Sequence, residues 1–308
     1  MGTITRRLFI ANIVAQSGIV VTGALVRLTG SGLGCPTWPD CTEGSLVPVA
    51  RQAEGVHKYI EFGNRMLTFV LVIVVFACIV AAVRQSPRRR PLILLALAGF
   101  VGIFGQAVLG GITVLTSLNP YLVASHLLLS MLLIVAAVAL YQRGQEDGDG
   151  PTTALVRTEL RVLAKVLVGV GALVVVLGTV VTGSGPHSGD AEAVVRFGLD
   201  PRVMSWLHAD VVIAFIGLTI ALALGLRLVD APATAQRRVW FLLAVSLGQG
   251  AIGYVQYFTG LPELVVALHV AGACLVWVAV LRIPYALRER AMSTQASDPR
   301  QPTPTLTN

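Results

Sequence analysis

The sequence predicts an all-α integral membrane protein, with eight transmembrane helices arranged as two four-helix bundles related by a pseudo-two-fold axis. Three observations support this fold class. Hydrophobic residues make up 55% of the 308-residue chain and charged residues only 13%, whereas soluble proteins carry roughly 25% charged residues. Apolar runs of about 20 residues, the length that spans a bilayer, recur along the chain. The basic residues gather on alternate connections between these runs.

Each apolar run is long enough for one transmembrane helix at a rise of about 1.5 Å per residue. We expect these helices at 8–27, 63–83, 91–115, 121–141, 162–182, 206–229, 238–258 and 262–286. Little of the chain is left for a soluble domain. The sequence then divides into an N-terminal four-helix half (1–142), a cytoplasmic linker (143–161), a C-terminal four-helix half (162–290) and a disordered cytoplasmic tail (291–308).

The net charge is +7, but the basic residues are distributed along the chain as in a membrane protein, which argues against a nucleic-acid partner. Alternate connections between the apolar runs carry most of the basic residues, as the positive-inside rule requires of cytoplasmic loops. We therefore expect a multi-pass protein of the plasma membrane with both termini in the cytoplasm. The pair Arg6-Arg7 loosely resembles a twin-arginine signal, but an uncleaved first helix explains these residues better.

Two of the four cysteines, Cys35 and Cys41, lie close together in the first outer loop and are flanked by Gly and Pro. An extracytoplasmic pair of this kind indicates a disulfide, with a redox-active pair as the alternative. Cys78 and Cys274 fall inside predicted helices, where a buried thiol usually serves packing.

The chain also contains an internal repeat. A Thr-Gly-Ser-Gly motif occurs at 29–32 and again at 182–185, and a Gly-Gln pair occurs at 105–106 and again at 248–249. Each Gly-Gln pair precedes a histidine by the same interval. Because each half has an even number of helices, the two halves share one orientation, unlike the inverted repeats of many transporters.

Three of the five histidines, namely His126, His208 and His269, lie near the outer ends of predicted helices. An ionisable residue at membrane depth is a functional candidate, although a single histidine often serves only helix packing. Imidazoles from two helices of a bundle commonly hold haem iron, so we predict that His208 and His269 form a facing pair of ligands. Zinc would require further N, S or O ligands nearby.

The repeat places Asn64 where the second half has His208. Asparagine is a poor iron ligand, and His57 lies on the same helical face but about 10 Å away along the axis. Helical spacing brings Glu61 and Arg65 to this side as well. One interpretation is a solvated helix end with a Glu61–Arg65 ion pair. The other is a reaction site with a carboxylate beside the substrate.

These residues and motifs resemble those of the haem A synthases, over roughly 8–286. The most specific segment is 23–41 (GALVRLTGSGLGCPTWPDC), which is similar to the end of the family's first helix and its cysteine-bearing outer loop. The resemblance implies an eight-helix membrane enzyme that oxidises the C8 methyl of haem O. Two successive hydroxylations would give a formyl group and hence haem A for terminal oxidases.

The resemblance also implies cofactors, ligands and partners. His208 and His269 correspond to the axial ligands of a haem B cofactor in the C-terminal half, and His126 corresponds to a ligand of the substrate haem O in the N-terminal half. The implied partners are the haem O synthase (a farnesyltransferase), the assembly of terminal oxidases, membrane lipid and an electron acceptor that the sequence does not identify.

The family's helix-two motif, Glu-x-x-His-Arg, reads Glu-Phe-Gly-Asn-Arg at 61–65 in this chain. Glu61 therefore corresponds to the catalytic carboxylate and Arg65 is retained, whereas Asn64 replaces the histidine. Two arrangements of the substrate haem follow. Either His126 is its only strong ligand, or His57 shares the site, which requires a broken helix or a haem well outside the membrane.

Two other functions remain as alternatives. A di-haem electron-transfer protein of the cytochrome b type would have two matched bis-histidine sites and no role for Glu61. A parallel-repeat transporter needs polar groups at mid-membrane, where Gln106 and Gln249 are the exceptions among apolar residues. The sequence assigns no role to His187.

Overall fold

The architecture is that of a computed structural model, which describes residues 1–190 and 195–291. In this part of the chain, eight helices are long and apolar enough to cross a membrane, which confirms the predicted fold class. They are α1 (Thr3–Leu28), α2 (His57–Val83), α3 (Arg90–Leu115), α4 (Pro120–Gln145), α5 (Thr158–Ser184), α6 (Pro201–Leu228), α7 (Ala233–Phe258) and α8 (Glu263–Leu281). The predicted tail, apart from Ala291, lies outside the described residues.

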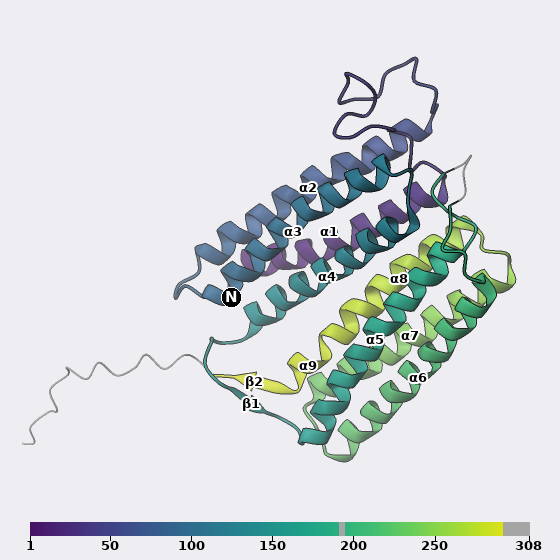
Figure 1. Ribbon diagram of the computed structural model, residues 1–308. Coiled ribbons are helices and arrows are strands. Elements are labelled where there is room, and N and C mark those ends of the chain that lie inside the picture. Colours follow the sequence, from purple (N-terminus) through teal and green to yellow (C-terminus); the bar gives the residue numbers. More distant parts are fainter. Residues whose placement is uncertain (191–194, 292–308) are drawn as a thin grey trace, which may run out of the picture.

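The helices form two groups that follow the order of the chain (Figure 1). In the first, α1 packs on α2, α2 on α3, α3 on α4, and α4 again on α1. In the second, α5, α6, α7 and α8 pack on one another in the same cyclic order. The groups meet where α1 packs on α8 and α4 packs on α5 and α8. Exchanging the halves maps the α1–α8 contact onto the α5–α4 contact, as a pseudo-two-fold relation would.

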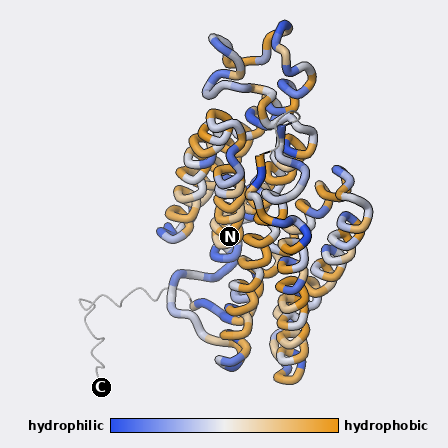
Figure 2. The backbone as a smooth tube through the Cα atoms, turned by 45° about the vertical axis from the view of Figure 1, so that its right-hand side comes forward, coloured by the Kyte–Doolittle hydropathy of each residue, from blue (hydrophilic) through white to orange (hydrophobic). Residues whose placement is uncertain are grey.

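Most helices are longer than the apolar runs that predict them. Figure 2 shows hydrophobic residues along the helices and hydrophilic ones at their ends and in the long loop before α2. The difference in helix length matters most in α2. This helix begins at His57, six residues before the expected position 63, so the motif at 61–65 is helical. Polar residues end the apolar run in the sequence, but their backbone continues the helix. Hydropathy therefore underestimates the length of such helices.

The last predicted span, 262–286, agrees with the eighth candidate membrane span, Glu263–Ala286. Within it α8 ends at Leu281, and the one-turn helix α9 (Ile283–Ala286) follows. Pro284 lies inside this turn, and a proline removes a backbone donor and disfavours helical geometry at the residue before it. The chain then enters a short strand, β2 (Arg288–Arg290), which pairs antiparallel with β1 (Thr152–Ala154) of the linker.

The core is continuous across the two halves. One cluster of buried side chains contains Met131 and Ile134 of α4 together with Phe215 of α6 and Trp277 of α8. The indole of Trp277 donates a hydrogen bond to the Met131 carbonyl at 3.1 Å, across the seam between the halves. The halves are therefore joined through a packed apolar core.

The two ends of the helix bundle differ in chemistry. We call the end with the connections 29–56, 116–119, 185–200 and 259–262 the disulfide end, since Cys35 and Cys41 are joined there in a disulfide, as expected. We call the opposite end, with the connections 84–89, 146–157, 229–232 and 282–291, the arginine-rich end. The predicted histidine ligands all lie toward the disulfide end of their helices.

Candidate functional site between the helices

Each of the three candidate histidine ligands lies against a glycine of a neighbouring helix. A Cβ atom added at Gly110 of α3 would come within 3.1 Å of the His126 ring, and one at Gly253 of α7 within 3.2 Å of the His269 ring. Gly178 of α5 stands in the same relation to His208, at 3.2 Å. Glycine at these positions leaves room for an imidazole directly against the adjoining helix.

These three imidazoles have unused nitrogens. The Nδ1 atoms of His126, His208 and His269 are buried and have no hydrogen-bond partner among the described residues. The His208 ring lies near the Val174 carbonyl but does not reach it in hydrogen-bond geometry. Buried polar atoms are rarely left unpaired, so these nitrogens are candidates for binding a ligand.

The helices that carry His126 and His269 are held by equivalent glutamines. Gln106 Nε2 donates to the His126 carbonyl at 3.0 Å and to Ser130 Oγ at 2.6 Å. Gln249 Nε2 donates to the His269 carbonyl at 2.7 Å. The repeat seen in the sequence therefore corresponds to a repeated hydrogen bond, which fixes the helix turn beneath each imidazole.

Asn64 faces α1. Its Oδ1 atom accepts a hydrogen bond from Thr22 Oγ1 at 2.8 Å. Helix α2 runs unbroken through Gly63, so the backbone shows no break of the kind that would let His57 approach the level of Asn64. The first half thus has a neutral, hydrogen-bonded amide where the second half has an unpaired imidazole.

The two remaining histidines are engaged in hydrogen bonds. His57 Nδ1 pairs with Ser31 Oγ at 2.8 Å, and Ser31 in turn pairs with Thr29 Oγ1 at 2.8 Å. His187 Nε2 pairs with the Leu261 carbonyl at 3.1 Å. Both rings tie loops together at the disulfide end, which is a structural role that residue type alone did not reveal.

Glu61 is buried, with 6% of its surface exposed, and both of its oxygens have partners. One oxygen accepts from the Cys35 backbone N–H at 2.7 Å, and the other accepts from Arg65 at 2.7 Å. Arg65 also donates to the carbonyls of Cys35, Thr37 and Asp40 at 2.8, 3.1 and 3.0 Å. The Glu61–Arg65 ion pair therefore exists, but it anchors the disulfide loop instead of lying in solvent.

A second anchor of this loop is Lys58, which was not among the predicted site residues. Lys58, only 3% exposed, donates to the carbonyls of Val49, Ala50 and Gln52 at 2.7, 3.3 and 3.4 Å. The Trp38 ring lies against Gly111 of α3, where a Cβ atom would overlap it. Three charged residues one helical turn apart on α2 thus hold the loop, while its tryptophan reaches α3. Only the spacing 58, 61 and 65 hinted at this common face.

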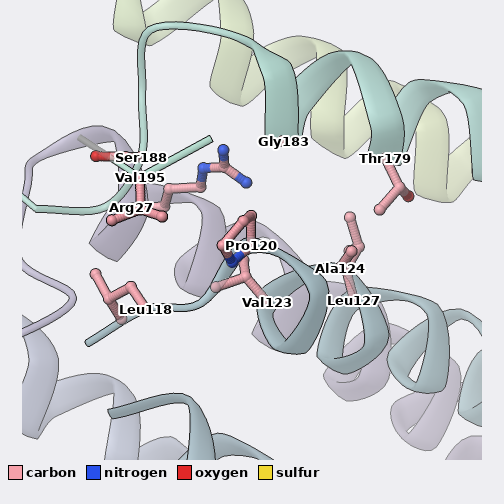
Figure 3. Close-up of a pocket in the computed structure, with 10 residues that line it drawn as sticks. All are labelled: Arg27, Leu118, Pro120, Val123, Ala124, Leu127, Thr179, Gly183, Ser188 and Val195. Atoms are coloured by element: carbon pink, nitrogen blue, oxygen red, sulfur yellow. The ribbon is translucent and has the colours of Figure 1, made fainter. Parts of the chain in front are cut away.

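A narrow pocket opens between the halves at the disulfide end (Figure 3). Figure 3 shows the Arg27 guanidinium extending toward Gly183, between the segment with Ser188 and the start of α4 at Pro120. Arg27 donates to the carbonyls of His187 and Thr182. The pocket has a free volume of about 10 Å³, the space of one water molecule, so it is a seam and not a haem site.

Comparisons with known proteins identify the family of the chain. A family described as cytochrome oxidase assembly protein (COX15-CtaA) matches residues 6–187, which include Glu61 and His126 but not His208 or His269. A heme A synthase of Geobacillus kaustophilus is 37% identical over 122 residues, covering 39% of this chain and 37% of that protein.

More distant relatives give the same result. Heme A synthases of Lysinibacillus sphaericus and Shewanella oneidensis are 34% and 30% identical over 123 and 145 residues. These matches cover 40% and 41% of this chain and 39% and 41% of the relatives. The chain thus spans about two fifths of the length of the curated relatives it matches.

Proposed function

The chain belongs to the COX15-CtaA family of cytochrome oxidase assembly proteins, and from that premise we propose that it is a haem A synthase. It oxidises the C8 methyl group of haem O to a formyl group through two successive hydroxylations. The observation that carries the proposal is a set of three half-buried histidines, two of them in the C-terminal half. Each is seated on a glycine, and each has a buried Nδ1 atom with no hydrogen-bond partner among the described residues. This asymmetric set fits one permanent haem and one exchangeable haem.

The C-terminal half holds haem B through His208 and His269. The two imidazoles come from α6 and α8, and their buried Nδ1 atoms have no hydrogen-bond partner among the described residues. Phe215, two helical turns further along α6, is 2% exposed and keeps the surroundings apolar. A bis-histidine haem of this kind supplies electron transfer, and an apolar shell excludes water from it.

The N-terminal half binds the substrate haem O mainly through His126. Asn64 Oδ1 is bonded to Thr22 and His57 Nδ1 to Ser31, so both side chains are held by contacts within the first half. A single strong protein ligand suits a haem that must enter, react and leave. The equivalent position of the second half is a histidine because its haem stays bound.

Glu61 carries the acid–base chemistry. Oxidation of a methyl group to an aldehyde releases protons, and a carboxylate near the reacting carbon can accept them and stabilise developing positive charge. Arg65 forms a 2.7 Å ion pair with this carboxylate. Glu61 also holds the Cys35 backbone, so the disulfide loop acts as a lid whose position is fixed by the catalytic carboxylate.

The cellular setting follows from the same proposal. The arginine-rich end faces the cytoplasm of a plasma membrane protein, because basic connections remain on that side. Haem O comes from the haem O synthase, a farnesyltransferase, and haem A passes to the assembly of terminal oxidases. An electron acceptor of the membrane completes the reaction. A di-haem electron carrier is not favoured, since Asn64 leaves the first half without a matched pair of ligands.

Haem analysis of membranes tests the proposal. Cells that make haem O but lack a haem A synthase are compared with and without the full-length chain. We expect haem A, or its hydroxymethyl precursor, only in the membranes that contain the protein. Membranes with the folded, haem-loaded protein but haem O alone would contradict the proposal and support electron transfer as the function.

A further inference from the structure

A cavity of about 340 Å³ lies at the arginine-rich end, away from the candidate haem sites. On α7 it is lined by residues of one helical face, Thr234, Arg237, Arg238 and Phe241, and at the end of α8 by Ala279 and Arg282. Its size falls at the lower end of the range of about 300 to 1,000 Å³ for small-molecule sites. Three guanidinium groups thus surround one opening.

The positive charge of this cavity is not neutralised by the described residues. None of its arginines forms an ion pair there, and Arg282 Nε is buried without a hydrogen-bond partner. Arg238 donates only to neutral oxygens, those of Gln142 and of the Arg282 backbone, at 3.1 and 2.8 Å. Arg238 and Arg282 also lie close enough to repel each other.

Other arginines at the same end are paired with acids. Arg89 and Arg143 bind Asp149 at 2.9 and 2.8 Å, and Arg288 and Arg290 bind Glu146 at 2.9 Å each. The fold therefore supplies carboxylates to one arginine cluster and none, among the described residues, to the cavity beside it. Arg282 Nε is buried without a partner, and buried polar atoms are rarely left unpaired, so this opening is a candidate site for an anion.

The position of the cavity identifies the source of that anion. It lies at the first turns of a membrane-spanning helix, where Trp240 and Phe241 are 41% and 48% exposed. Aromatic side chains of this kind occupy the headgroup level of a bilayer. A basic pocket between helices at this level matches the phosphate of an anionic lipid, whose acyl chains would lie along the exposed apolar surface.

We propose that this cavity is a binding site for the phosphate headgroup of an anionic phospholipid. Arg237 and Arg282 contact the phosphate, and Thr234 and the free end of α7 add hydrogen-bond donors and positive potential. Because Arg238 also bonds to Gln142 of α4, the bound lipid sits beside the seam between the two halves and stabilises it. This site is independent of the proposed enzyme activity.

The test uses the purified full-length protein, stripped of lipid in detergent, with dioleoylphosphatidylglycerol as the probe. Native mass spectrometry measures the lipid retained by the parent, by Arg237→Gln and by Arg282→Gln. Arg227→Gln is the matched control, because it removes an exposed arginine at the same end of the bundle but outside the cavity. We expect each cavity variant to weaken retention about fivefold, and the control to leave it unchanged.

Two further arms identify the ligand. Phosphatidylcholine has a phosphate but no net charge, and inorganic phosphate has no acyl chains. We expect both to be retained more weakly than phosphatidylglycerol and to raise the melting temperature less. Equal retention by the cavity variants and the Arg227→Gln control would overturn the proposal, even if a variant is less stable. Competition by inorganic phosphate at equal concentration would overturn the assignment to a lipid.

Discussion

The two halves of the molecule share the order of their helices, a glycine beside the histidine of the last helix, and a glutamine bonded to that histidine's carbonyl. They differ at the equivalent positions Asn64 in α2 and His208 in α6. His208 stands in the second half with an unpaired nitrogen. Asn64 stands in the first half, hydrogen-bonded to Thr22. The comparison teaches that a repeated scaffold acquires two functions when one copy loses a ligand and gains a nearby carboxylate. We infer a cofactor half and a reaction half.

The disulfide end sharpens this difference. In the first half, Glu61, Arg65 and Lys58 hold a loop closed by the Cys35–Cys41 disulfide. The corresponding connection of the second half, 185–200, leads into α6. Asp200 caps that helix by accepting hydrogen bonds from the N–H groups of Arg202 and Val203. The first-half loop is thus held by three charged residues of α2, and we infer that this anchoring serves the substrate site.

The largest expected effect concerns Glu61. The variant Glu61→Gln keeps the shape and an acceptor for the Cys35 N–H but removes the charge, so haem A production should fall about 100-fold or more. Bound haem should be retained, and the alcohol intermediate should accumulate. Extracted haems, separated by chromatography, give the measurement. Glu263→Gln, at the exposed start of α8, is the control, and an unchanged haem A yield in Glu61→Gln would exclude the catalytic role.

The cofactor half is tested by His208→Ala and His269→Ala. Loss of a residue that only hydrogen-bonds to a metal ligand weakens metal binding about 10- to 100-fold, so loss of a ligand should cost at least as much. The reduced-minus-oxidised spectrum of the purified protein should lose its low-spin haem signal. His187→Ala, which removes a histidine bonded to the Leu261 carbonyl, should retain the signal. A normal spectrum in both ligand variants would refute the assignment.

The variant Asn64→His makes the first half resemble the second. We expect the substrate haem to become six-coordinate and low-spin, and haem A production to fall severalfold because product leaves slowly. In contrast, His57→Ala should leave activity largely intact, since His57 is bonded to Ser31. Absorption and electron paramagnetic resonance spectra report the coordination. An unchanged substrate-haem spectrum in Asn64→His would show that Asn64 does not lie opposite His126.

The smallest expected effect concerns the linker between the halves. Burial alone would raise the pKa of Asp149, but hydrogen bonds and charge from Arg89 and Arg143 outweigh it and hold the pKa below its ordinary value. A depressed carboxyl pKa stabilises the fold above the unfolded-state pKa of about 3.9, and the contribution disappears as pH falls through the folded pKa.

Asp149→Asn should therefore cost about 1 kcal/mol or less at neutral pH, and nothing once the carboxyl is protonated in both states. Thermal melting at pH 7 and in mild acid measures the difference from the parent. The exposed Asp147 provides the control variant Asp147→Asn. A deficit in Asp149→Asn that is independent of pH would mean that the side chain acts through packing and not through its charge.

Hydropathy and the internal repeat predicted the eight helices, the disulfide and the positions of the candidate ligands, because these depend on composition and fixed spacing. They did not predict the role of Lys58 or the engagement of Glu61, since a loop's backbone carbonyls carry no sequence signal. The buried Asn12 and Gln16 of α1 were also missed, because two amides barely lower the hydropathy of an apolar helix. Ligation of haem by the histidines stays a prediction.

The pairing of β1 with β2 brings together the two ends of the C-terminal half. Strand β1 precedes α5 and β2 follows α9, so the chain enters and leaves this half at adjacent points. A unit whose ends meet can be cut from its neighbour or joined to it with little rearrangement. A split between Gln145 and Thr152 keeps the ribbon whole, and two separately produced fragments divided there should reassemble through the α4 seam.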